Sequence, residues 1–298
     1  MQVSELGEFG LIKRFRKSIK TDASVIKGSG DDCAVLAFDK DNYQLFTCDM
    51  IVEGVDFTLK DDASLIGRKA LAISLSDIAG CGGIPRHCVV SLGMPKDTRV
   101  SFIDKLFGGL SRLAKEYKVN IVGGDISRAP RIVVDLSLLG LVEKKCLVLR
   151  NGARVNDLIF VTGAIGGASF GKHLSFTPRL KEARFLVENF KINSMIDISD
   201  GLAQDLRHLL EESRLGGIIF EGLVPLSARV SDFKTAVSEG EDFELLFTLS
   251  RSEAARLMGK RIKNFFPIGQ VRDKKFGVKL LDRNNKEVDF FSNGFRHF

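Results

Sequence analysis

Apolar residues occur along this chain in two kinds of segment that alternate with each other. Residues 43–47, 87–92 and 132–142 form nearly continuous apolar runs, which are typical of strands. Residues 64–78 and 100–117 carry apolar residues at every third or fourth position, which predicts amphipathic helices, the first of them capped by Ser64. This alternation places the first half of the chain in the α/β or α+β class.

The same alternation continues to the end of the chain. It predicts further strands at residues 119–122, 158–162, 194–198, 216–221, 243–249 and 265–270, and helices at 179–189, 202–212 and 251–259. Polar residues, Asn and Gly at 143–145 and 150–157 favour a change of domain there. We therefore expect a two-domain α/β (α+β) protein, with an N-terminal mixed-sheet domain over residues 1–145 and a C-terminal α/β domain over residues 146–298.

Aspartates mark five short turns beside these apolar segments. They are Asp31 with Asp32, Asp49, Asp77, Asp125, and Asp197 with Asp200. For any single aspartate, a helix cap or a turn residue is the simpler interpretation. Carboxylates held close together raise one another's pKa, so several divalent cations would be needed to keep all of them ionised. Because Mg²⁺ typically bridges carboxylates to substrate phosphates, the pattern favours a Mg²⁺-dependent phosphotransferase that uses ATP.

Composition narrows the class of partner. The net charge is +6, but the basic residues are dispersed, and the 23 Phe and 2 Tyr lie mostly inside apolar runs, so we expect no nucleic-acid partner. No apolar stretch approaches the roughly 20 residues of a membrane helix, and residues 1–10 lack the pattern of a secretory signal. The five scattered cysteines form no CxxC pair, which favours reduced thiols and a cytoplasmic location.

Other known phosphate-binding motifs match the sequence less well. Residues 166–172 have the spacing of a P-loop, but His173 stands where that loop needs Ser or Thr to bind Mg²⁺. Gly28 and Gly30 are followed by two aspartates, which is not a dinucleotide-binding fingerprint. The signature motifs of protein kinases are absent from the sequence.

The sequence closely resembles the thiamine-monophosphate kinase family, part of the superfamily that includes aminoimidazole ribonucleotide synthetase. The resemblance rests on GEFGLI at 7–12, GSGDDCAV at 28–35, TCDMIVEGV at 47–55, SLSDIA at 74–79, GGDIS at 123–127, IDISDGL at 196–202 and GEDFELLF at 240–247. Because these segments keep their order over nearly the whole chain, the set is highly specific. It implies direct transfer of the ATP γ-phosphoryl group to thiamine monophosphate, giving thiamine diphosphate, in a homodimer formed through the N-terminal domains.

The resemblance also implies roles for individual residues. The implied Mg²⁺ ligands are Asp32, Thr47, Cys48, Asp49, Asp77, Asp125, Asp197 and Asp200. The implied ATP-binding residues are Gly124, Asp125, Arg150 and Ser199, and the implied substrate-binding residues are Asp56, Glu241 and Phe295. Arginine suits a phosphate, and a carboxylate suits the cationic thiamine ring. No catalytic side-chain nucleophile is required, because an oxygen of the acceptor phosphate attacks.

The chain departs from the family's usual pattern around the acceptor. Asp56 stands where the family usually has His, Glu239 where it has Gly, and Ser292 where it has an aromatic residue, and the segment after Lys172 is shorter. Phe291 or Phe295 are the possible substitutes for that aromatic residue. Two alternatives therefore stay open: a related ATP-dependent enzyme with another acceptor, and a non-catalytic sensor of nucleotides or thiamine phosphates.

Overall fold

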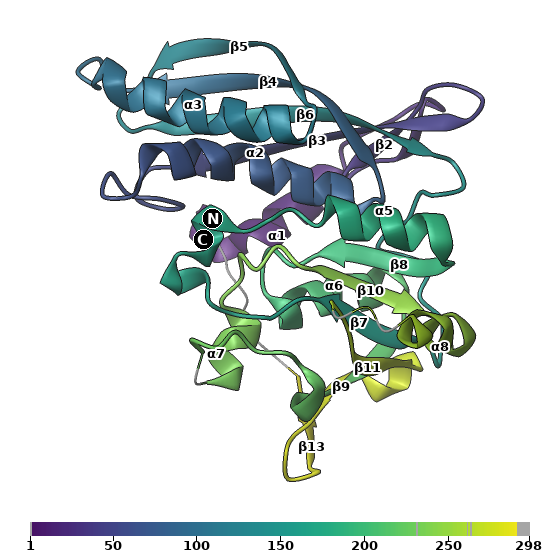
Figure 1. The fold of residues 1–298 in the computed structure, drawn as a ribbon. Coiled ribbons are helices and arrows are strands. Elements are labelled where there is room, and N and C mark those ends of the chain that lie inside the picture. Colours follow the sequence, from purple (N-terminus) through teal and green to yellow (C-terminus); the bar gives the residue numbers. More distant parts are fainter. Residues whose placement is uncertain (1, 231, 261, 263, 291–298) are drawn as a thin grey trace.

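The structure is a computed structural model that describes residues 2–230, 232–260, 262 and 264–290, and it contains two sheets with helices packed against them (Figure 1). The helices are α1 (Val3–Arg16), α2 (Ala63–Gly80), α3 (Val100–Glu116), α4 (Lys172–Ser175), α5 (Leu180–Asn189), α6 (Leu202–Glu212), α7 (Phe233–Ser238) and α8 (Arg251–Gly259). The strands are β1 (Val25–Lys27), β2 (Ala34–Ala37), β3 (Asn42–Val52), β4 (Ile84–Met94), β5 (Asn120–Arg128), β6 (Val133–Glu143), β7 (Leu158–Thr162), β8 (Ile192–Asp197), β9 (Gly216–Phe220), β10 (Leu245–Leu249), β11 (Phe265–Arg272), β12 (Val278–Leu281) and β13 (Glu287–Asp289). The predicted mixed α/β class and the two sheet-containing domains are confirmed.

The first sheet has the strand order β1-β2-β3-β6-β4-β5. Strand β3 pairs with β6 along its whole length, and β4 pairs in parallel with the edge strand β5. Helices α2 and α3 lie on one face of this sheet (Figure 1). Burial therefore alternates along β3: Leu45 and Ile51 are buried toward the helices, whereas Phe46 and Met50 are exposed on the other face.

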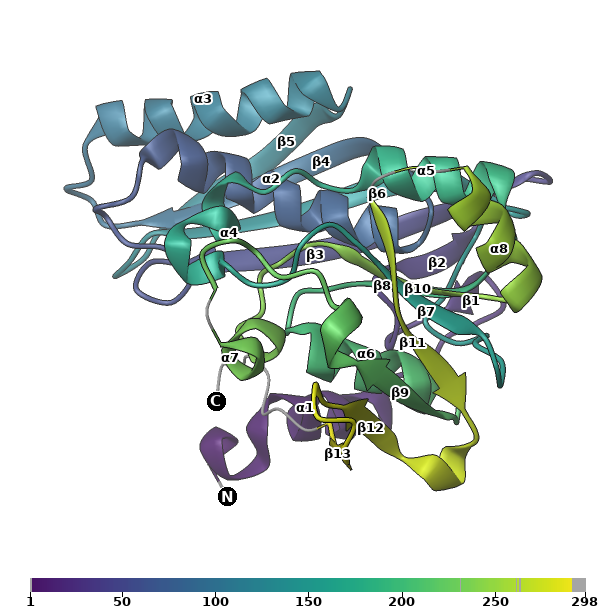
Figure 2. The same cartoon turned by 60° about the horizontal axis from the view of Figure 1, so that its bottom comes forward.

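The second sheet has the strand order β13-β12-β9-β11-β7-β10-β8. Helix α2 of the first domain contacts α4, α5 and β8 of the second, so the two domains share an interface (Figures 1 and 2). A single hydrophobic cluster joins Leu75 and Ile78 of α2 to Leu186, Met195 and Phe247 of the second domain. The C-terminal half of α2 is therefore buried between the two sheets.

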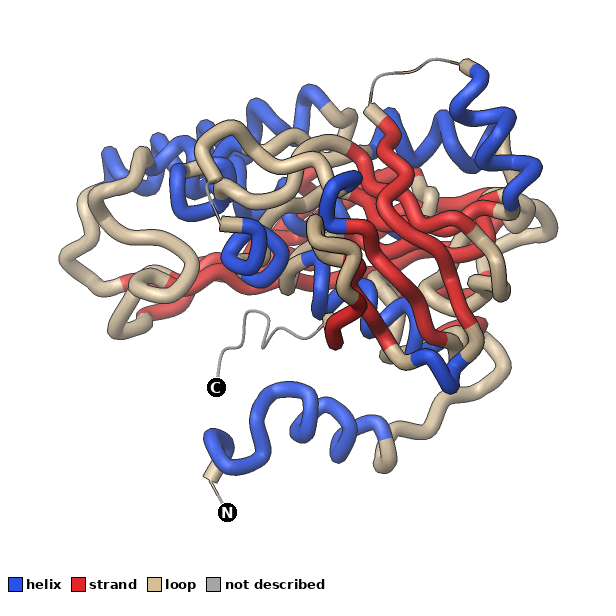
Figure 3. Tube along the Cα trace, turned by 90° about the horizontal axis from the view of Figure 1, so that it is seen from below, coloured by secondary structure: helices blue, strands red, loops and turns tan. Residues whose placement is uncertain are grey.

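The amino-terminal helix α1 lies at the periphery of the molecule in the view from below (Figure 3), where it contacts α6. The Phe9 and His208 rings contact each other with their centroids 4.9 Å apart, and the Arg16 guanidinium lies 3.7 Å from the Glu212 carboxylate. Both partners belong to α6. Within the described ranges, the structure contains no helix long and apolar enough to cross a membrane.

Several predicted boundaries and local assignments were wrong. Helix α2 begins at Ala63, one residue before the predicted range, since the Asp62 side chain, not that of Ser64, accepts hydrogen bonds from the first backbone N–H groups. Asp49 and Asp125 lie inside strands rather than in turns, and Asp77 lies inside a helix. Strand β10 begins two residues later than predicted, because Phe243 has a positive φ of 50°.

Candidate functional site

Four of the predicted aspartates meet where the two domains face each other. Asp49 lies on β3 and Asp77 on α2, both in the first domain, and Asp197 is the last residue of β8 in the second. Asp32 lies in the loop before β2. Asp32 and Asp197 are buried, whereas Asp49 and Asp77 are partly exposed. We call these four residues the acidic cluster.

Hydroxyl groups hold three of these carboxylates in place. The Ser74 Oγ donates to Asp49 Oδ2 over 2.6 Å, and the Ser76 Oγ donates to Asp197 Oδ2 over 2.6 Å. The Thr47 hydroxyl donates to the Asp77 carboxylate. Helix α2 and strand β3 thus orient the cluster with short neutral donors, which leave the negative charge of each carboxylate uncompensated.

Arg150 is the cation paired with this cluster, and it reaches Asp32 from the segment between the domains. Its Nε lies 2.9 Å and one terminal nitrogen 2.6 Å from Asp32 Oδ1, while its backbone N–H donates to Asp31 Oδ1 over 2.9 Å. The second oxygen of Asp32, Oδ2, is buried and has no hydrogen-bond partner in the described part of the chain. The predicted ATP-binding arginine therefore contacts the cluster itself.

Burial and mutual repulsion raise the pKa of every member of the cluster. Burial, together with the charges of Asp197 and Asp31, raises the pKa of Asp32 to about 7 in spite of Arg150. Burial likewise raises the pKa of Asp49 to about 6 and that of Asp197 to about 6, against the hydrogen bonds from Ser74 and Ser76. Burial and then the charges of Asp49, Asp197 and Asp32 raise the pKa of Asp77 well above its ordinary value.

This arrangement fits hard divalent cations. All the donor atoms are oxygens, the charges of four carboxylates exceed that of one guanidinium, and Asp32 offers a buried oxygen that no described group satisfies. Mg²⁺ prefers such ligands and would favour the ionised carboxylates. The cluster therefore has the chemistry of a site for more than one Mg²⁺ ion.

Gly80 keeps the space in which the Asp32 carboxylate lies. A Cβ atom at Gly80 would come within 2.0 Å of Asp32 Oδ2 and 2.9 Å of its Cγ. We expect Gly80→Ala to displace this carboxylate and to lower turnover by about 10²-fold at fixed Mg²⁺, because a displacement of about 1 Å in such a site has effects of that size. A Mg²⁺ titration of the rate checks this.

Gly108→Ala is the matched control for that titration. Gly108 also lies in a helix, but its added Cβ would meet only the end of the Arg112 side chain at 3.5 Å. An unchanged Mg²⁺ requirement in Gly80→Ala would mean that Asp32 does not act through the metal.

Two of the predicted substrate-binding residues, Asp56 and Glu241, line a small cavity together with Asp49 of the cluster. This cavity, about 120 Å³, is lined by Asp49, Met50, Ile51, Asp56, Lys69, Ile73, Ser199, Glu241 and Phe243. We call it the acceptor cavity. The Asp56 carboxylate accepts a hydrogen bond from the Val52 backbone over 2.7 Å, so it closes its own turn. The buried Lys69 ammonium donates to the Asp56 carbonyl over 3.0 Å and pairs with Glu241.

A buried ionic network fixes the loop that carries Glu241. Glu241 and Phe243 have positive φ angles of 55° and 50°. Residues other than glycine rarely adopt such angles, so contacts with neighbouring residues must hold this backbone conformation. Between them, the Asp242 carboxylate accepts from the Gly166 backbone over 2.7 Å and from Lys172 Nζ over 2.9 Å. Lys172 is therefore part of this network, which argues against the P-loop interpretation of residues 166–172.

Glu244 and Glu239, which lie on either side of this loop, are also held by hydrogen bonds. Glu244 accepts two hydrogen bonds from Arg179, over 2.6 Å and 2.7 Å. Glu239, one of the departures from the family pattern, accepts from the backbone of Ser169 over 3.1 Å. This departure thus anchors the glycine-rich loop.

The structure does not bring Gly124 and Asp125 to the acidic cluster. Asp49 pairs with Leu136, Leu136 with Val90, and Val90 with Gly124, so Asp49 and Gly124 share one row of the sheet. Three strand spacings separate them, or about 14 Å. Beside Gly124 and Asp125, a separate cavity of about 610 Å³ is lined by apolar residues that include Ile103, Phe107 and Ile121.

Cys48 and Asp200 are the remaining predicted ligands. The Cys48 thiol is exposed on the opposite face of β3 from Thr47 and Asp49, so only its backbone could reach the cluster. Asp200 lies beside Asp205 and His208, with ligand atoms that all lie within 4.8 Å of one another. Phe291, Ser292 and Phe295 fall outside the described residues.

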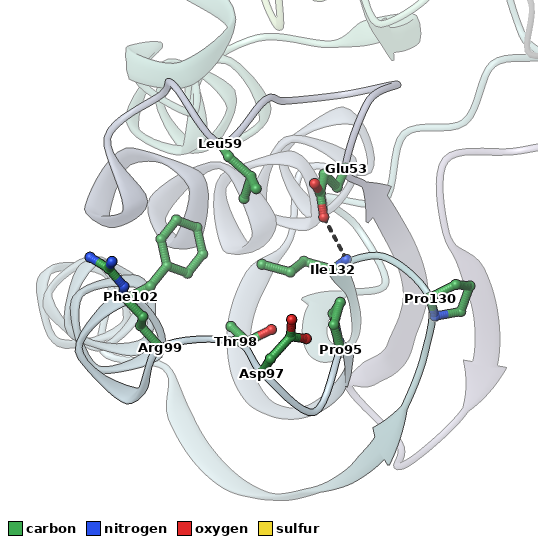
Figure 4. Close-up of a pocket in the computed structure, with 9 residues that line it drawn as sticks. All are labelled: Glu53, Leu59, Pro95, Asp97, Thr98, Arg99, Phe102, Pro130 and Ile132. Carbon is green, nitrogen blue, oxygen red and sulfur yellow. Dashed lines mark hydrogen bonds between the residues drawn. The ribbon is translucent and has the colours of Figure 1, made fainter.

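The cavity drawn in Figure 4 contains none of the predicted site residues. It measures about 470 Å³ and lies beyond the end of β3, between the segments that follow β4 and β5. Glu53 lines it and accepts a hydrogen bond from the Ile132 backbone over 2.9 Å (Figure 4). This carboxylate is satisfied by the protein itself, so the cavity is a less suitable metal or phosphate site than the acidic cluster.

Sequence reasoning missed Lys69, Ser74, Ser76 and Asp205. Lys69 had a detectable signal, since it lies three residues after Ile66 and four before Ile73, on the apolar face of α2. Ser74 and Ser76 had none, because serines next to an aspartate in a helix are common and only the fold shows what they contact.

Comparison with known proteins identifies the family of this chain. Residues 30–142 match the family described as AIR synthase related protein, N-terminal domain, and residues 154–280 match AIR synthase related protein, C-terminal domain. Thiamine-monophosphate kinase of Buchnera aphidicola subsp. Schizaphis graminum is 34% identical, with 99% of both chains covered. That of Bacillus subtilis is 32% identical, with 98% of this chain and 100% of its own covered. The chain belongs to the thiamine-monophosphate kinase family.

A solved structure extends the likeness to the whole fold. The structure of AaThiL complexed with AMPPCP and TMP superposes with a TM-score of 0.87 at 30% identity, and covers 100% of this chain and 99% of its own. The family resemblance inferred from seven short segments is therefore confirmed, and the family is one of phosphotransferases.

Proposed function

We propose that the acidic cluster and the acceptor cavity together carry the activity of the family: ATP-dependent phosphorylation of thiamine monophosphate to thiamine diphosphate. The observation that carries this proposal is the position of the acceptor cavity, since Asp49 of the cluster and Glu241 of the acceptor loop line the same cavity. The relative AaThiL, complexed with AMPPCP and TMP, supports an ATP analogue and thiamine monophosphate as ligands.

Asp32, Asp49, Asp77 and Asp197 would hold Mg²⁺ ions, with help from Thr47 and Asp200. The bound ions would neutralise the phosphate charges and align the donor and acceptor phosphates, which is most of what phosphoryl transfer requires. Ser74 and Ser76 keep the carboxylates aimed between the domains. Arg150 limits the net negative charge when the phosphates enter, and Ser199 lies at the acceptor cavity.

The apolar cavity beside Gly124 and Asp125 suits the base of ATP. Phe107 offers a flat aromatic face and Ile121 an apolar contact, and the two glycines before Asp125 let the backbone approach a phosphate. The buried side chains of Val90 and Leu136 occupy the row of the sheet between Gly124 and Asp49, so a nucleotide in this cavity would not contact Asp49 of the same chain along that row. Asp125 would then bind an ion on the nucleotide rather than join the cluster directly.

Direct transfer predicts the fate of the γ-phosphorus. The described part of the acceptor cavity holds carboxylates, a lysine and a serine, and the acceptor phosphate supplies the attacking oxygen. With γ-³²P-labelled ATP, thiamine monophosphate and Mg²⁺, the label should appear in the terminal phosphate of thiamine diphosphate, with none on the protein. Labelled protein as a competent intermediate would overturn direct transfer; Mg²⁺-dependent ATP binding without product would favour another acceptor or the sensor alternative.

A homodimer formed through the first sheet is part of this proposal. The face of that sheet opposite α2 and α3 exposes apolar side chains, with Phe46 at 42%, Met50 at 56% and Val89 at 40% exposure. Apolar side chains grouped on one sheet face are typical of an interface. A cytoplasmic location also remains a prediction, consistent with five cysteines that form no disulfide.

The dimer has a matched test. We expect a solution mass of about 66 kDa, twice the 32.9 kDa of one chain, and we expect Val89→Glu to reduce it to that of one chain. Val100→Glu, at the exposed start of α3, adds the same charge away from this face and should leave the dimer intact. Sedimentation equilibrium measures both, and a monomeric unmodified chain would rule out the dimer.

A further inference from the structure

Lys69 is buried in a place where a lysine needs a reason. It lies in the middle of α2, is 1% exposed, and is followed by Ala70, Leu71 and Ala72, all buried. Lysine is almost never fully buried unless it is paired, because its ammonium loses its hydration. Its partners therefore indicate what this side chain does.

The contacts of Lys69 leave one hydrogen-bond donor for a ligand. An ammonium group has three N–H donors. One goes to the Asp56 carbonyl over 3.0 Å and one to Glu241, and no third acceptor occurs among the described residues. Because Lys69 lines the acceptor cavity, the remaining donor is available to a molecule bound there.

Helix α2 places this cation in line with the acidic cluster. Lys69, Ile73 and Asp77 are four residues apart and therefore lie on one face of the helix. At about 1.5 Å per residue, roughly 12 Å of helix separates Lys69 from Asp77. A phosphate group is much shorter than this distance, so it would contact Lys69 within the acceptor cavity, which Asp49 of the cluster also lines.

Lys69 and Glu241 form a pair of opposite charges that matches the proposed acceptor. Thiamine monophosphate carries a permanently cationic thiazolium ring and an anionic phosphate, joined by two carbons. Glu241 is held ready for the ring, because its backbone N–H donates to the Ser199 carbonyl over 2.7 Å and its loop is anchored through Asp242. In the structure the two side chains neutralise each other. When the acceptor binds, Lys69 could contact its phosphate and Glu241 its cationic ring in place of this mutual contact.

We propose that Lys69 binds the phosphate of the acceptor while Glu241 binds its cationic ring. The inference rests on the proposed function and adds a residue and a recognition principle to it: the acceptor cavity selects a zwitterion. Lys69 is then a substrate-binding residue that holds the acceptor phosphate toward the cluster, rather than a counter-ion that only stabilises the fold.

The test compares two ligands that differ only in the phosphate. Binding of thiamine monophosphate and of thiamine is measured calorimetrically in the presence of Mg²⁺ and AMPPCP, for the unmodified chain and for Lys69→Met. Methionine keeps the length and burial of the side chain without its charge. We expect Lys69→Met to weaken the binding of thiamine monophosphate by about tenfold to a hundredfold, which is the range for the loss of a hydrogen bond to a charged group. The binding of thiamine should weaken by less than about threefold.

Two further variants separate recognition from folding. Lys69→Arg should regain part of the affinity for thiamine monophosphate, and Glu241→Gln should weaken both ligands, because both carry the ring. Equal losses for the two ligands in Lys69→Met, or no loss, would overturn the inference while the unmodified chain still forms thiamine diphosphate. An unmodified chain that binds neither ligand and forms no product would overturn the proposed function first and this inference with it.

Discussion

Asp49→Asn should lower thiamine diphosphate formation by about 10²- to 10³-fold, the loss typical when one preorganised electrostatic group is removed from an active site. Asparagine keeps the shape of the side chain and can still accept the hydrogen bond from Ser74 Oγ. What it loses is the negative charge that would attract Mg²⁺. Steady-state rates over a range of Mg²⁺ concentrations measure the effect.

In the absence of metal, Asp49→Asn should be at least as stable as the unmodified chain. Asp49 is repelled by Asp135 and Asp32 and is partly buried, so its charge opposes folding. Asp97→Asn is the matched control, since Asp97 is an exposed aspartate that lines the separate cavity of Figure 4. Full activity in Asp49→Asn, or an equal loss in Asp97→Asn, would mean that the cluster is not the metal site.

Metal-free protein should become less stable as the pH rises from about 4 to about 7, and Mg²⁺ should reverse this loss. The folded-state pKa is about 7 for Asp32, about 6 for Asp49 and about 6 for Asp197, all above the ordinary value near 4. In this window the folded chain keeps protons that the unfolded chain releases. The stabilisation is therefore complete below about pH 4 and is lost as the pH rises through the folded-state values.

His208 opposes this trend. Burial lowers the pKa of His208 to about 4, so between about pH 4 and 6.5 this histidine is protonated in the unfolded chain but neutral in the folded one. Its contribution therefore favours folding more as the pH rises toward about 6.5. One histidine does not outweigh three carboxylates, and Asp77 and Asp205 act in the same direction as those three. We therefore expect a net loss of at least about 2 kcal/mol of unfolding free energy.

Thermal unfolding checks this prediction in EDTA and in Mg²⁺, near pH 5 and near pH 7.5. Tm should be lower at the higher pH in EDTA, and Mg²⁺ should raise it mainly there, since a cation that binds only the folded chain stabilises it. Asp197→Asn should flatten the pH dependence in EDTA. A Tm that rises with pH in EDTA and does not change when Mg²⁺ is added would contradict the account of the cluster.

Local pattern was enough to predict most helices and strands, because their apolar spacing is regular. It also located Asp32, Asp49, Asp77 and Asp197, each beside a predicted strand or helix. Their meeting, however, depends on contacts between the domains, such as Ser76 with Asp197, which are 121 residues apart in sequence. No local pattern encodes such a contact.

The position of Asp125 shows a second limit. Its Gly-Gly-Asp motif resembles that of the family, yet the strand order places it three strands from Asp49. Strand order results from long-range pairing and was not predicted. Alternation along β3 similarly separates the Cys48 side chain from those of Thr47 and Asp49, and this could have been anticipated from the two-residue period of a strand.

Asp56 and Lys69 show how contacts change the meaning of a residue. From the sequence, Asp56 is a charge that would repel a phosphate. In the structure its carboxylate accepts the Val52 N–H, and its carbonyl accepts from Lys69, which brings a positive charge to the same cavity. The departure from the family pattern is thus accompanied by a nearby cation.

Formation of thiamine diphosphate from thiamine monophosphate and ATP, followed with Mg²⁺ and with EDTA, tests the central claim most directly. The account predicts steady product formation with Mg²⁺, equal amounts of thiamine diphosphate and ADP, and none of either in EDTA. Product formation that continues in EDTA, or ATP consumption without thiamine diphosphate, would contradict it.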